Sequence, residues 1–374
     1  MKIMFFHTNL CVGGIEKSLV NLANKLALSN DVEIVLLNKE GKFLTDLQPN
    51  IKVFQADKRL KVFGVSSRDS KSKGLLFFLK RNLFALKRKH SKTEKWIENY
   101  VAKTKINYNC DVAIAYTDDA FVMDLVLEKV SADKKFVFYH SDFRNKRFKN
   151  DDYVNRATKF DKYICVSRSC KEITDICCPK LSNITDYLYN SVNISTEIEP
   201  FEYDDSYFNI LTVARVSYEK RIDWGIEIVS KLVDNGFKVR YYICGNGKDF
   251  EKNKNLVKEL KKEDNIFFLG EKKNPYNYIK NSDLILLLSK TESFGISLIE
   301  GFKLGVPCLT TNTISAKEIV GNYGYVCEHD KELIYNKLSE ILKDKSDLNK
   351  KKKDLKNYQF DNEENIRRFL EFCE

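Results

Sequence analysis

Two glutamates on either side of a glycine-containing segment are the residues of this chain that most directly suggest chemistry. Glu292 and Glu300 enclose Ser-Phe-Gly-Ile-Ser-Leu-Ile, and an apolar run stands on each side of the pair. This pattern predicts a strand, a loop, a helix and a second strand, with Glu300 about two turns into the helix. The glycine and the free N–H groups of the helix suit a phosphate, and the two carboxylates suit hydroxyl groups. A nucleotide sugar carries all of these groups, although a loop cap and a solvated helix face would explain the glutamates equally simply.

Two cations follow an earlier apolar run of the chain. Arg215 and Lys220 come directly after residues 210–214, which read as a strand. Arginine offers a planar fork of donors and lysine a mobile point charge, so together they suit a pyrophosphate. Cations held there would stabilise the negative charge that builds on a departing nucleoside diphosphate. The alternative is a pair of solvated surface cations.

The elements that must position these residues form two similar series. Short apolar runs alternate with helical patterns in both halves of the chain, as expected for parallel sheets covered on both faces. At 374 residues the chain is long enough for two domains. We therefore expect an α/β protein of two doubly wound, Rossmann-like domains, with the ligand in a deep cleft between them at the carboxyl ends of the strands. The predicted strands are 3–8, 32–37, 112–116, 136–140, 163–166, 210–214, 239–244, 266–269, 284–288 and 306–310.

Glycines mark two further turns. Gly13 and Gly14 follow the first predicted strand and precede a helix, so their backbone could approach a phosphate or a sugar. Gly245 and Gly247 form a Gly-x-Gly turn after residues 239–244, which is less than a dinucleotide fingerprint. An ordinary glycine turn remains the alternative for the first pair, and packing beside a nucleotide is the modest expectation for the second.

Five motifs stand in one order along the chain: Gly13-Gly14-Ile15-Glu16, Val213–Lys220, Gly245-Asn-Gly247, the glutamate pair, and Gly305-Val-Pro307. With these motifs the chain resembles the retaining family 4 glycosyltransferases of the GT-B fold, of the bacterial lipopolysaccharide and capsular polysaccharide type. The similarity is good from about residue 205 to residue 325. The resemblance implies an acceptor-binding domain at residues 1–195 and a nucleotide-sugar-binding domain at 206–356. It also implies that a final helix at 357–374 crosses back to the first domain. The lysine-rich run at 343–356 before it reads from the sequence as a basic linker.

The same resemblance assigns roles to residues. Glu292 would contact hydroxyls of the transferred sugar, Glu300 the ribose, and Arg215 with Lys220 the pyrophosphate. A histidine at the end of a strand, here His140, would approach the donor sugar, although a lone histidine is more often structural. Asn190 matches a turn of the family, although Ser191 and Asn193 replace its usual Gly and Asp. The implied catalytic residues are Glu292, Arg215, Lys220 and His140, and the implied donor-binding residues are Gly13, Gly14, Asn190, Gly245, Phe294, Gly295, Ile296 and Glu300.

Several absences in the sequence limit the possible functions. The chain has no Asp-x-Asp, so we expect a metal-independent transfer without a cofactor, in which the cations and the helix terminus replace Mg²⁺. The ten cysteines show no framework, and we expect reduced thiols. Neither a signal peptide nor a membrane span is expected, because no uncharged apolar stretch of 18 residues occurs.

Positive charge is concentrated in one region of the amino-terminal half. Residues 58–105 hold 15 Lys or Arg and 3 acidic residues, a net charge of +12, whereas the whole chain carries +10. Wound as a helix, residues 74–89 place five leucines on one face and cations with two phenylalanines on the other. We expect the leucines to pack on the core and the opposite face to contact an anionic bilayer. A solvated helix or a nucleic-acid surface are the alternatives, and no nucleic-acid motif accompanies the charge. The predicted membrane patch is Phe77, Lys80, Arg81, Phe84, Lys87 and Arg88.

These observations predict a hexosyltransferase that uses a nucleotide diphosphate sugar, most simply a UDP-sugar. Its acceptor would be a lipid-linked saccharide of bacterial surface polysaccharide, and its place the cytoplasm, peripheral on the inner face of the cell membrane. A UDP-sugar epimerase of the same fold is one alternative, and it would convert the donor without an acceptor. A non-catalytic accessory subunit is another, and it should lack the two cations and the two glutamates.

Overall fold

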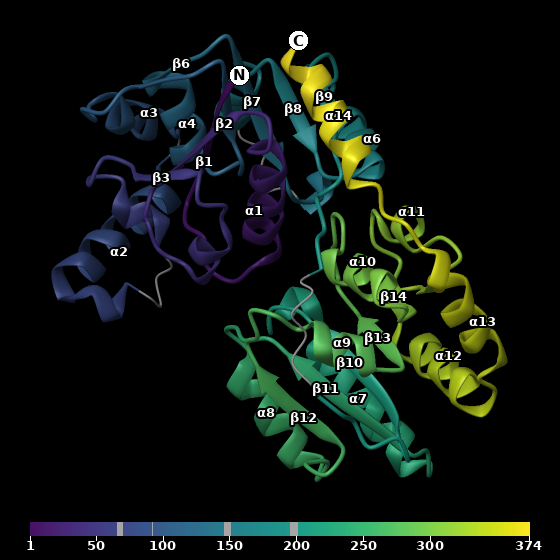
Figure 1. Cartoon of the computed structure of the whole chain (residues 1–374). Helices are drawn as coiled ribbons and strands as arrows, with labels where there is room; N and C mark the ends of the chain where they lie inside the picture. Colours follow the sequence, from purple (N-terminus) through teal and green to yellow (C-terminus); the bar gives the residue numbers. More distant parts are fainter. Residues whose placement is uncertain (66–69, 92, 146–150, 195–200) are drawn as a thin grey trace. The chain divides into compact units, whose positions relative to one another are not determined.

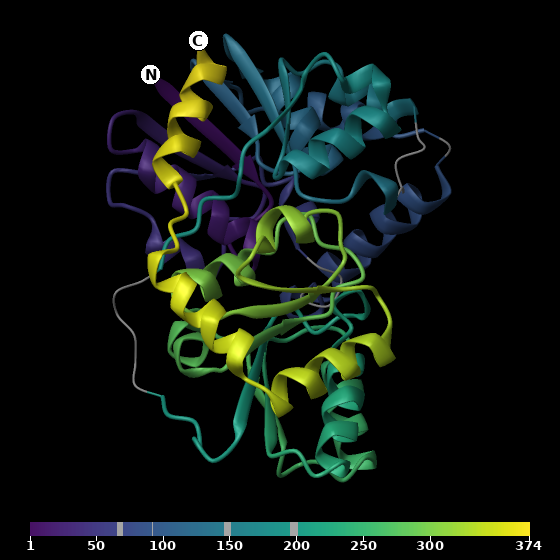
Figure 2. The same cartoon turned by 90° about the vertical axis from the view of Figure 1, so that its right-hand side faces the viewer.

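The computed structural model describes residues 1–374 except 66–69, 92, 146–150 and 195–200. The chain forms two compact units, coloured along the sequence in Figures 1 and 2. Unit 1 consists of Met1–Ser191 together with Asn362–Glu374, and unit 2 consists of Val192–Asp361.

The described part of unit 1 holds a seven-stranded sheet in the order β3-β2-β1-β5-β7-β8-β9, and every strand pairing in it is parallel. Two short strands, β4 (Tyr108–Asn109) and β6 (Val130–Ser131), form a separate two-stranded sheet and come directly before β5 and β7 in the sequence. The strands are β1 (Lys2–His7), β2 (Asp31–Leu36), β3 (Lys52–Gln55), β5 (Val112–Ala115), β7 (Lys134–Tyr139), β8 (Lys162–Cys165) and β9 (Thr185–Tyr187). The helices are α1 (Gly14–Leu26), α2 (Leu75–His90), α3 (Lys95–Ala102), α4 (Ala120–Lys129), α5 (Asp151–Ala157), α6 (Arg168–Cys177) and α14 (Asn362–Cys373).

The described part of unit 2 holds a six-stranded sheet in the order β12-β11-β10-β13-β14-β15, again parallel throughout. Its strands are β10 (Phe208–Val213), β11 (Val239–Cys244), β12 (Ile266–Gly270), β13 (Leu284–Leu287), β14 (Cys308–Thr311) and β15 (Gly324–Cys327). Its helices are α7 (Ile222–Asp234), α8 (Phe250–Glu259), α9 (Tyr276–Asn281), α10 (Ile296–Lys303), α11 (Ala316–Val320), α12 (Lys331–Lys343) and α13 (Ser346–Asp354).

These sheets confirm the prediction of two doubly wound domains, and each of the ten predicted strands is present within a few residues. The central strands are buried along nearly their whole length, as parallel strands between helices must be. The sequence pattern missed β3, β9 and β15, which are short edge strands with half-exposed residues and therefore a weak apolar signal.

The prediction of a basic linker at residues 343–356 is wrong. This segment ends α12 and forms α13, because Leu348 and Leu355 are buried against unit 2 and anchor a helix whose other faces carry lysines. The lysine run suggested a solvated linker, but two well-placed leucines are enough to hold an amphipathic helix.

The last helix returns to unit 1. In α14, Phe369 is fully buried in the core that also contains Ile3 and Phe136, and its ring lies 6.2 Å from that of Phe136. Arg368 donates to the backbone oxygen of Tyr187 at 2.9 Å and to Asp186 at 2.6 Å. The core of unit 1 is therefore built from both ends of the described chain.

Among the helices of the described ranges, none combines the length and the apolar character needed to cross a membrane.

Candidate functional site

The centre of the unit 2 sheet is a topological switch point. β10 pairs with β11 on one side and with β13 on the other, so the chain leaves β10 in one direction and later returns to its other edge. Loops that follow β10 and β13 diverge there at the carboxyl edge of the sheet, which is where open α/β sheets bind ligands.

Two predicted site residues meet at this switch point. Lys220 lies in a short 3-10 helix after β10, and Glu292 lies in the loop between β13 and α10. The Nζ of Lys220 is 2.5 Å from an Oε of Glu292, and the two side chains are 24% and 17% exposed. Arg215, which follows the same strand end as Lys220, is exposed. The arrangement thus offers cations and a carboxylate on one open edge.

Backbone hydrogen bonds between neighbouring loops fix the position of this pair. The N–H of Lys290 donates to the oxygen of Glu219 at 2.7 Å, which joins the loop after β13 to the loop after β10. The hydroxyl of Ser315 donates to the backbone oxygen of Glu292 at 3.3 Å. Lys220 and Glu292 therefore sit on loops that are tied to each other, which limits the entropy lost when a ligand binds.

The Gly-x-Gly turn after β11 has a packing reason of its own. A Cβ on Gly245 would lie 1.9 Å from the backbone oxygen of Ala214, and one on Gly247 would lie 2.2 Å from that of Val216. Glycine is needed because the loop after β11 presses against the loop that leads to Lys220. Gly245 therefore supports the position of Lys220, whether or not Gly245 itself contacts a ligand.

The start of α10 presents backbone donors at the same edge. Gly295 adopts a left-handed conformation with φ of 86° and caps the helix, whose first residue is Ile296. Phe294 is buried, with its ring 6.1 Å from that of Phe360. Glu300 is only 3% exposed, whereas the side chain of Glu292 is 17% exposed. The two glutamates are therefore not equivalent, and a plain solvated helix face is wrong for Glu300.

Unit 1 has a corresponding switch point between β1 and β5, and aromatic residues gather there. His7 ends β1, while Tyr116 and His140 follow the ends of β5 and β7. The ring of Tyr116 lies 5.0 Å from that of His140 and 6.3 Å from that of His7. Burial lowers the pKa of His140 to about 3, aided by the nearby His7 and opposed by a hydrogen bond with the backbone of Tyr116. His140 is thus a neutral imidazole at the edge of the sheet.

The first glycine motif and Asn190 lie beside this aromatic group. Gly13 caps α1 in an extended conformation, and a Cβ there would lie 2.2 Å from an Oε of Glu16. Ser18, on α1, contacts the hydroxyl of Tyr116 at 2.8 Å and donates to Oδ1 of Asn190 at 2.8 Å. Asn190 is therefore buried against α1. Ser18 connects it to Tyr116, whose ring lies beside that of His140.

The predicted site residues thus fall into two groups. Arg215, Lys220, Gly245, Glu292 and the start of α10 belong to unit 2, whereas Gly13, Gly14, His140 and Asn190 belong to unit 1.

Sequence reasoning missed two members of the second group, His7 and Tyr116. His7 and Tyr116 each end an apolar run exactly as His140 does, so the same signal was available for them. Asp118 follows β5, and burial raises its pKa to about 7.

The predicted orientation of α2 is wrong. The five leucines that were expected to pack on the core are exposed, whereas Phe84 turns inward and contacts the rings of Phe63 at 4.8 Å and Trp96 at 5.9 Å. Phe77 is also partly covered, and the Nε of Arg81 donates to the backbone oxygen of Val65 at 3.1 Å. Only Lys80, Lys87 and Arg88 of the predicted membrane patch are exposed. Aromatic partners decided the inward face, because a stack of rings buries more area than leucines would.

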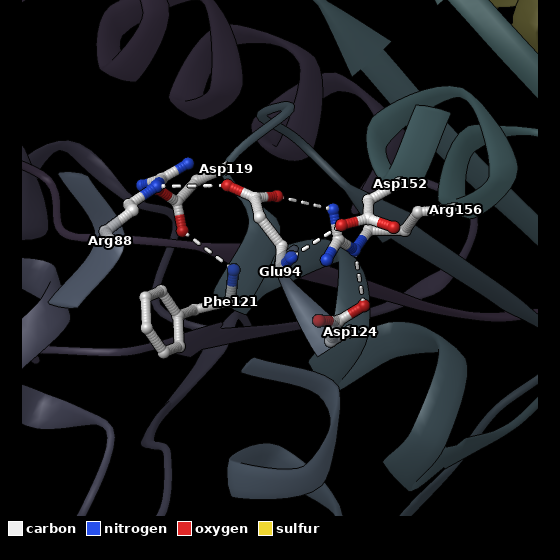
Figure 3. Close-up of polar contacts among 7 residues, drawn as sticks. All are labelled: Arg88, Glu94, Asp119, Phe121, Asp124, Asp152 and Arg156. Atoms are coloured by element: carbon white, nitrogen blue, oxygen red, sulfur yellow. Dashed lines mark hydrogen bonds and ion pairs between the residues drawn. The ribbon is translucent and has the colours of Figure 1, made fainter. Parts of the chain in front are cut away.

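Arg88 is also drawn toward its own unit by carboxylates (Figure 3). Its guanidinium lies 3.2 Å from Glu94 and 3.5 Å from Asp119, which caps α4. Glu94 continues the network to Arg156 at 2.9 Å, and Arg156 pairs with the buried Asp124 at 2.6 Å. This network connects α2, α3, α4 and α5, so Arg88 serves the fold of unit 1.

Comparison with known proteins adds to this geometry. Residues 194–361 match a family model described as glycosyl transferases group 1. The chain is 35% identical to N-acetyl-alpha-D-glucosaminyl L-malate synthase of Bacillus anthracis over 128 residues. This aligned region covers 33% of each protein. Over 134 residues the chain is 31% identical to lipopolysaccharide 1,6-galactosyltransferase of Salmonella typhimurium, which covers 34% of this chain and 36% of that protein. The chain therefore matches about a third of the length of these curated relatives.

A solved structure matches the whole chain. The crystal structure of Anabaena HepE in complex with UDP superimposes with a TM-score of 0.68 over 99% of both chains, at 17% identity. At this level of identity the match establishes the fold, which is GT-B.

Proposed function

We propose that the chain is a retaining hexosyltransferase of family 4, because residues 194–361 match the glycosyl transferases group 1 model and the chain has the GT-B fold. Its donor is a nucleotide diphosphate sugar, with UDP as the nucleotide. Its acceptor is a lipid-linked saccharide of a bacterial surface polysaccharide such as capsule, O-antigen or wall glycan. The relative named for lipopolysaccharide and the solved neighbour in complex with UDP support this choice of substrates.

One observation carries the proposal: the Lys220–Glu292 pair, 2.5 Å apart at the switch point of the unit 2 sheet. In this pair Lys220 and Glu292 neutralise each other, and a nucleotide sugar separates them when it binds. Its diphosphate takes over Lys220, and Glu292 is released to accept hydrogen bonds from sugar hydroxyls. The exchange replaces one ion pair by two charge-assisted interactions, so little charge is left without compensation.

The transfer breaks the bond between the sugar and the diphosphate and forms a bond to the acceptor hydroxyl on the same face of the sugar. Negative charge builds on the departing diphosphate, and Lys220 with Arg215 stabilises it. The N–H groups at Phe294 and Gly295 and the start of α10 add their dipoles. Glu300 takes the ribose hydroxyls. In this proposal the cations take the place of a metal ion, and no cofactor is needed.

Unit 1 receives the acceptor. His140, a neutral imidazole directly after β7, approaches the transferred sugar, and the loops around it in unit 1 take the acceptor. A lipid-linked acceptor brings the enzyme to the inner face of the cell membrane as a peripheral protein.

Titration calorimetry with UDP tests the site, and product analysis tests the reaction. Lys220→Ala should weaken UDP binding about 100-fold or more, because a charged contact to the diphosphate is lost. Lys231→Ala is the matched control, since Lys231 also pairs with a glutamate, Glu332 at 2.9 Å, on an exposed face of unit 2. Equal affinities in the two variants would reject the site.

Incubation with UDP-glucose, UDP-galactose and their N-acetylated forms then separates the alternatives. A transferase forms a product with retained configuration only when acceptor is added, and hydrolyses its donor slowly without it. Conversion of one UDP-sugar into another in the absence of acceptor would instead identify an epimerase.

A further inference from the structure

The outward face of α2 is a continuous stripe of leucines. Leu75, Leu76, Leu79, Leu83 and Leu86, here named the leucine stripe, are 72%, 83%, 47%, 66% and 54% exposed. At 100° per residue these five side chains occupy an arc of about 100° on the helix. Single exposed leucines are ordinary on a protein surface, but five on one face of one helix indicate a binding surface.

Contacts on the opposite face fix this orientation. Phe84 packs against Phe63, Trp96 and Tyr100, with ring centroids 4.8, 5.9 and 5.3 Å apart. Arg81 donates to a backbone oxygen and Arg88 pairs with two carboxylates, as shown for Arg88 in Figure 3. A rotation that buried the leucines would expose these rings and break these ion pairs. The helix lies at the margin of unit 1 (Figure 1), and the exposure of its five leucines shows that the stripe faces solvent.

Lysines border the stripe on both sides. On the helical wheel Lys80 and Lys87 follow one edge of the stripe and Lys89 follows the other, and all three are exposed. The helix contains no aspartate or glutamate. Lysine side chains can extend along an apolar layer and keep their ammonium groups at a polar boundary.

This charge pattern selects among possible partners. Association of two copies through the stripe would bring lysine edges together without a carboxylate on α2 to balance them. When an amphipathic helix lies in the plane of an anionic bilayer, its apolar face enters the acyl chains and the lysines at its edges reach the lipid phosphates. The leucine stripe and its lysine borders fit this arrangement.

We propose that α2 binds an anionic bilayer surface through the leucine stripe, with Lys80 and Lys89 at the level of the lipid phosphates. The ammonium of Lys87 instead lies 4.6 Å from the centre of the Trp96 ring and helps to hold the helix to unit 1. The face with the phenylalanines and arginines, which the sequence pattern predicted to contact the bilayer, instead holds the helix to unit 1. This inference rests on the proposed function for its biological sense, since a lipid-linked acceptor lies in that surface. The contact itself needs only unit 1.

Sedimentation with vesicles tests the contact. The full chain should bind vesicles of phosphatidylcholine and phosphatidylglycerol in a 3:1 ratio, and bind pure phosphatidylcholine more weakly. The Leu76→Gln/Leu79→Gln/Leu83→Gln variant should lose about 100-fold or more in partitioning, because three side chains leave the acyl layer. Lys80→Gln/Lys89→Gln should lose about 10-fold or more on the anionic vesicles and little on the neutral ones.

Leu28→Gln/Ile176→Gln is the matched control, since these unit 1 side chains are 68% and 74% exposed but lie outside α2. The control should bind vesicles as the unchanged chain does. All variants should keep their thermal stability, because only exposed side chains are altered.

Three outcomes would overturn the inference: no binding of the unchanged chain to anionic vesicles, unchanged binding of the leucine variant, or equal loss in the control. A fourth is a chain that is dimeric by light scattering without lipid and becomes monomeric in the leucine variant, which would assign the stripe to self-association. UDP titration separates this test from the proposed function, since Lys220 and Glu292 belong to unit 2. Vesicle binding without UDP binding would reject the proposed function and leave the stripe as assigned.

Discussion

The two sheets of this protein share a topology but end in different chemistry. At the switch point of unit 2, Arg215, Lys220 and Glu292 place charges on a partly exposed edge. At the switch point of unit 1, the aromatic rings of His7, Tyr116 and His140 lie together, and those of His7 and Tyr116 are buried. Ion pairs are abundant in unit 1 as well, but the network from Arg88 to Asp124 joins helices and serves the fold.

This difference shows how one architecture can hold two unlike ligands. Parallel sheets deliver the residues after their central strands to one edge, and the types of those residues then decide what binds. Charges suit a diphosphate, and an edge of neutral groups suits a sugar. The predictions below test whether the two edges, and the contacts beneath them, are separable in this way.

The largest effect is expected from Asp124→Ala, which removes a carboxylate from the ion network of unit 1. Arg156 is buried and would keep only Glu94 as a partner, so the free energy of unfolding should fall by about 3–5 kcal/mol. Urea unfolding followed by circular dichroism measures this. UDP affinity at 10 °C should stay unchanged, and a parallel loss of UDP affinity would show that the units are not separable.

Glu292→Gln should act on the other edge in the opposite manner. Turnover should fall by about 100-fold, since a charged hydrogen-bond acceptor at the sugar is replaced by a neutral amide, while the free energy of unfolding changes by less than about 1 kcal/mol. Steady-state kinetics and thermal melts provide the two numbers. Glu332→Gln, which alters the exposed pair with Lys231, is the control and should leave both unchanged.

Gly245→Ala tests how tightly the loops beneath the charged edge are packed. The new Cβ would collide with the backbone oxygen of Ala214, so we expect a destabilisation about 2 kcal/mol larger than that of Gly236→Ala. Gly236 also has positive φ but faces open space, so the comparison isolates the collision. Equal melting temperatures for the two variants would mean that the loop moves aside freely.

The smallest effect concerns pH and the aromatic edge. His140 has a pKa of about 3 in the folded protein and 6.5 as its ordinary value, so only the unfolded chain takes up a proton on this residue below about pH 6.5. A lowered folded pKa gives stability that is present at neutral pH and is lost as the pH falls. The loss from pH 7.5 to 5.5 should be about 1 kcal/mol greater in the unchanged protein than in His140→Gln. Denaturant titrations at both pH values measure the free energy of unfolding. An equal loss between the two pH values in both proteins would contradict the prediction.

The positions of the strands and the residues at their ends were predictable because both depend on local apolar runs. Lys220 and Glu292 were correctly placed after β10 and β13, but nothing in the sequence indicates that residues 72 positions apart form an ion pair. The network of Arg156, Glu94 and Asp124 was missed for the same reason, since its members come from separate helices.

The face on which α2 packs could not be predicted from its own residues. Periodicity identifies two unlike faces, whereas the choice between them depends on Phe63, Trp96 and Tyr100, which lie outside the helix. The lysine run around α13 misled in a similar way, because Leu348 and Leu355 outweigh the surrounding charge only once a surface exists for them.

The position of α14 has a consequence for biosynthesis. Phe369 completes the same core as Ile3, so unit 1 encloses its interior only after the whole of residues 192–361 has left the ribosome. Until then its partly open interior is a natural client for chaperones. Unit 2, encoded in one continuous segment, can finish folding first although it is made second.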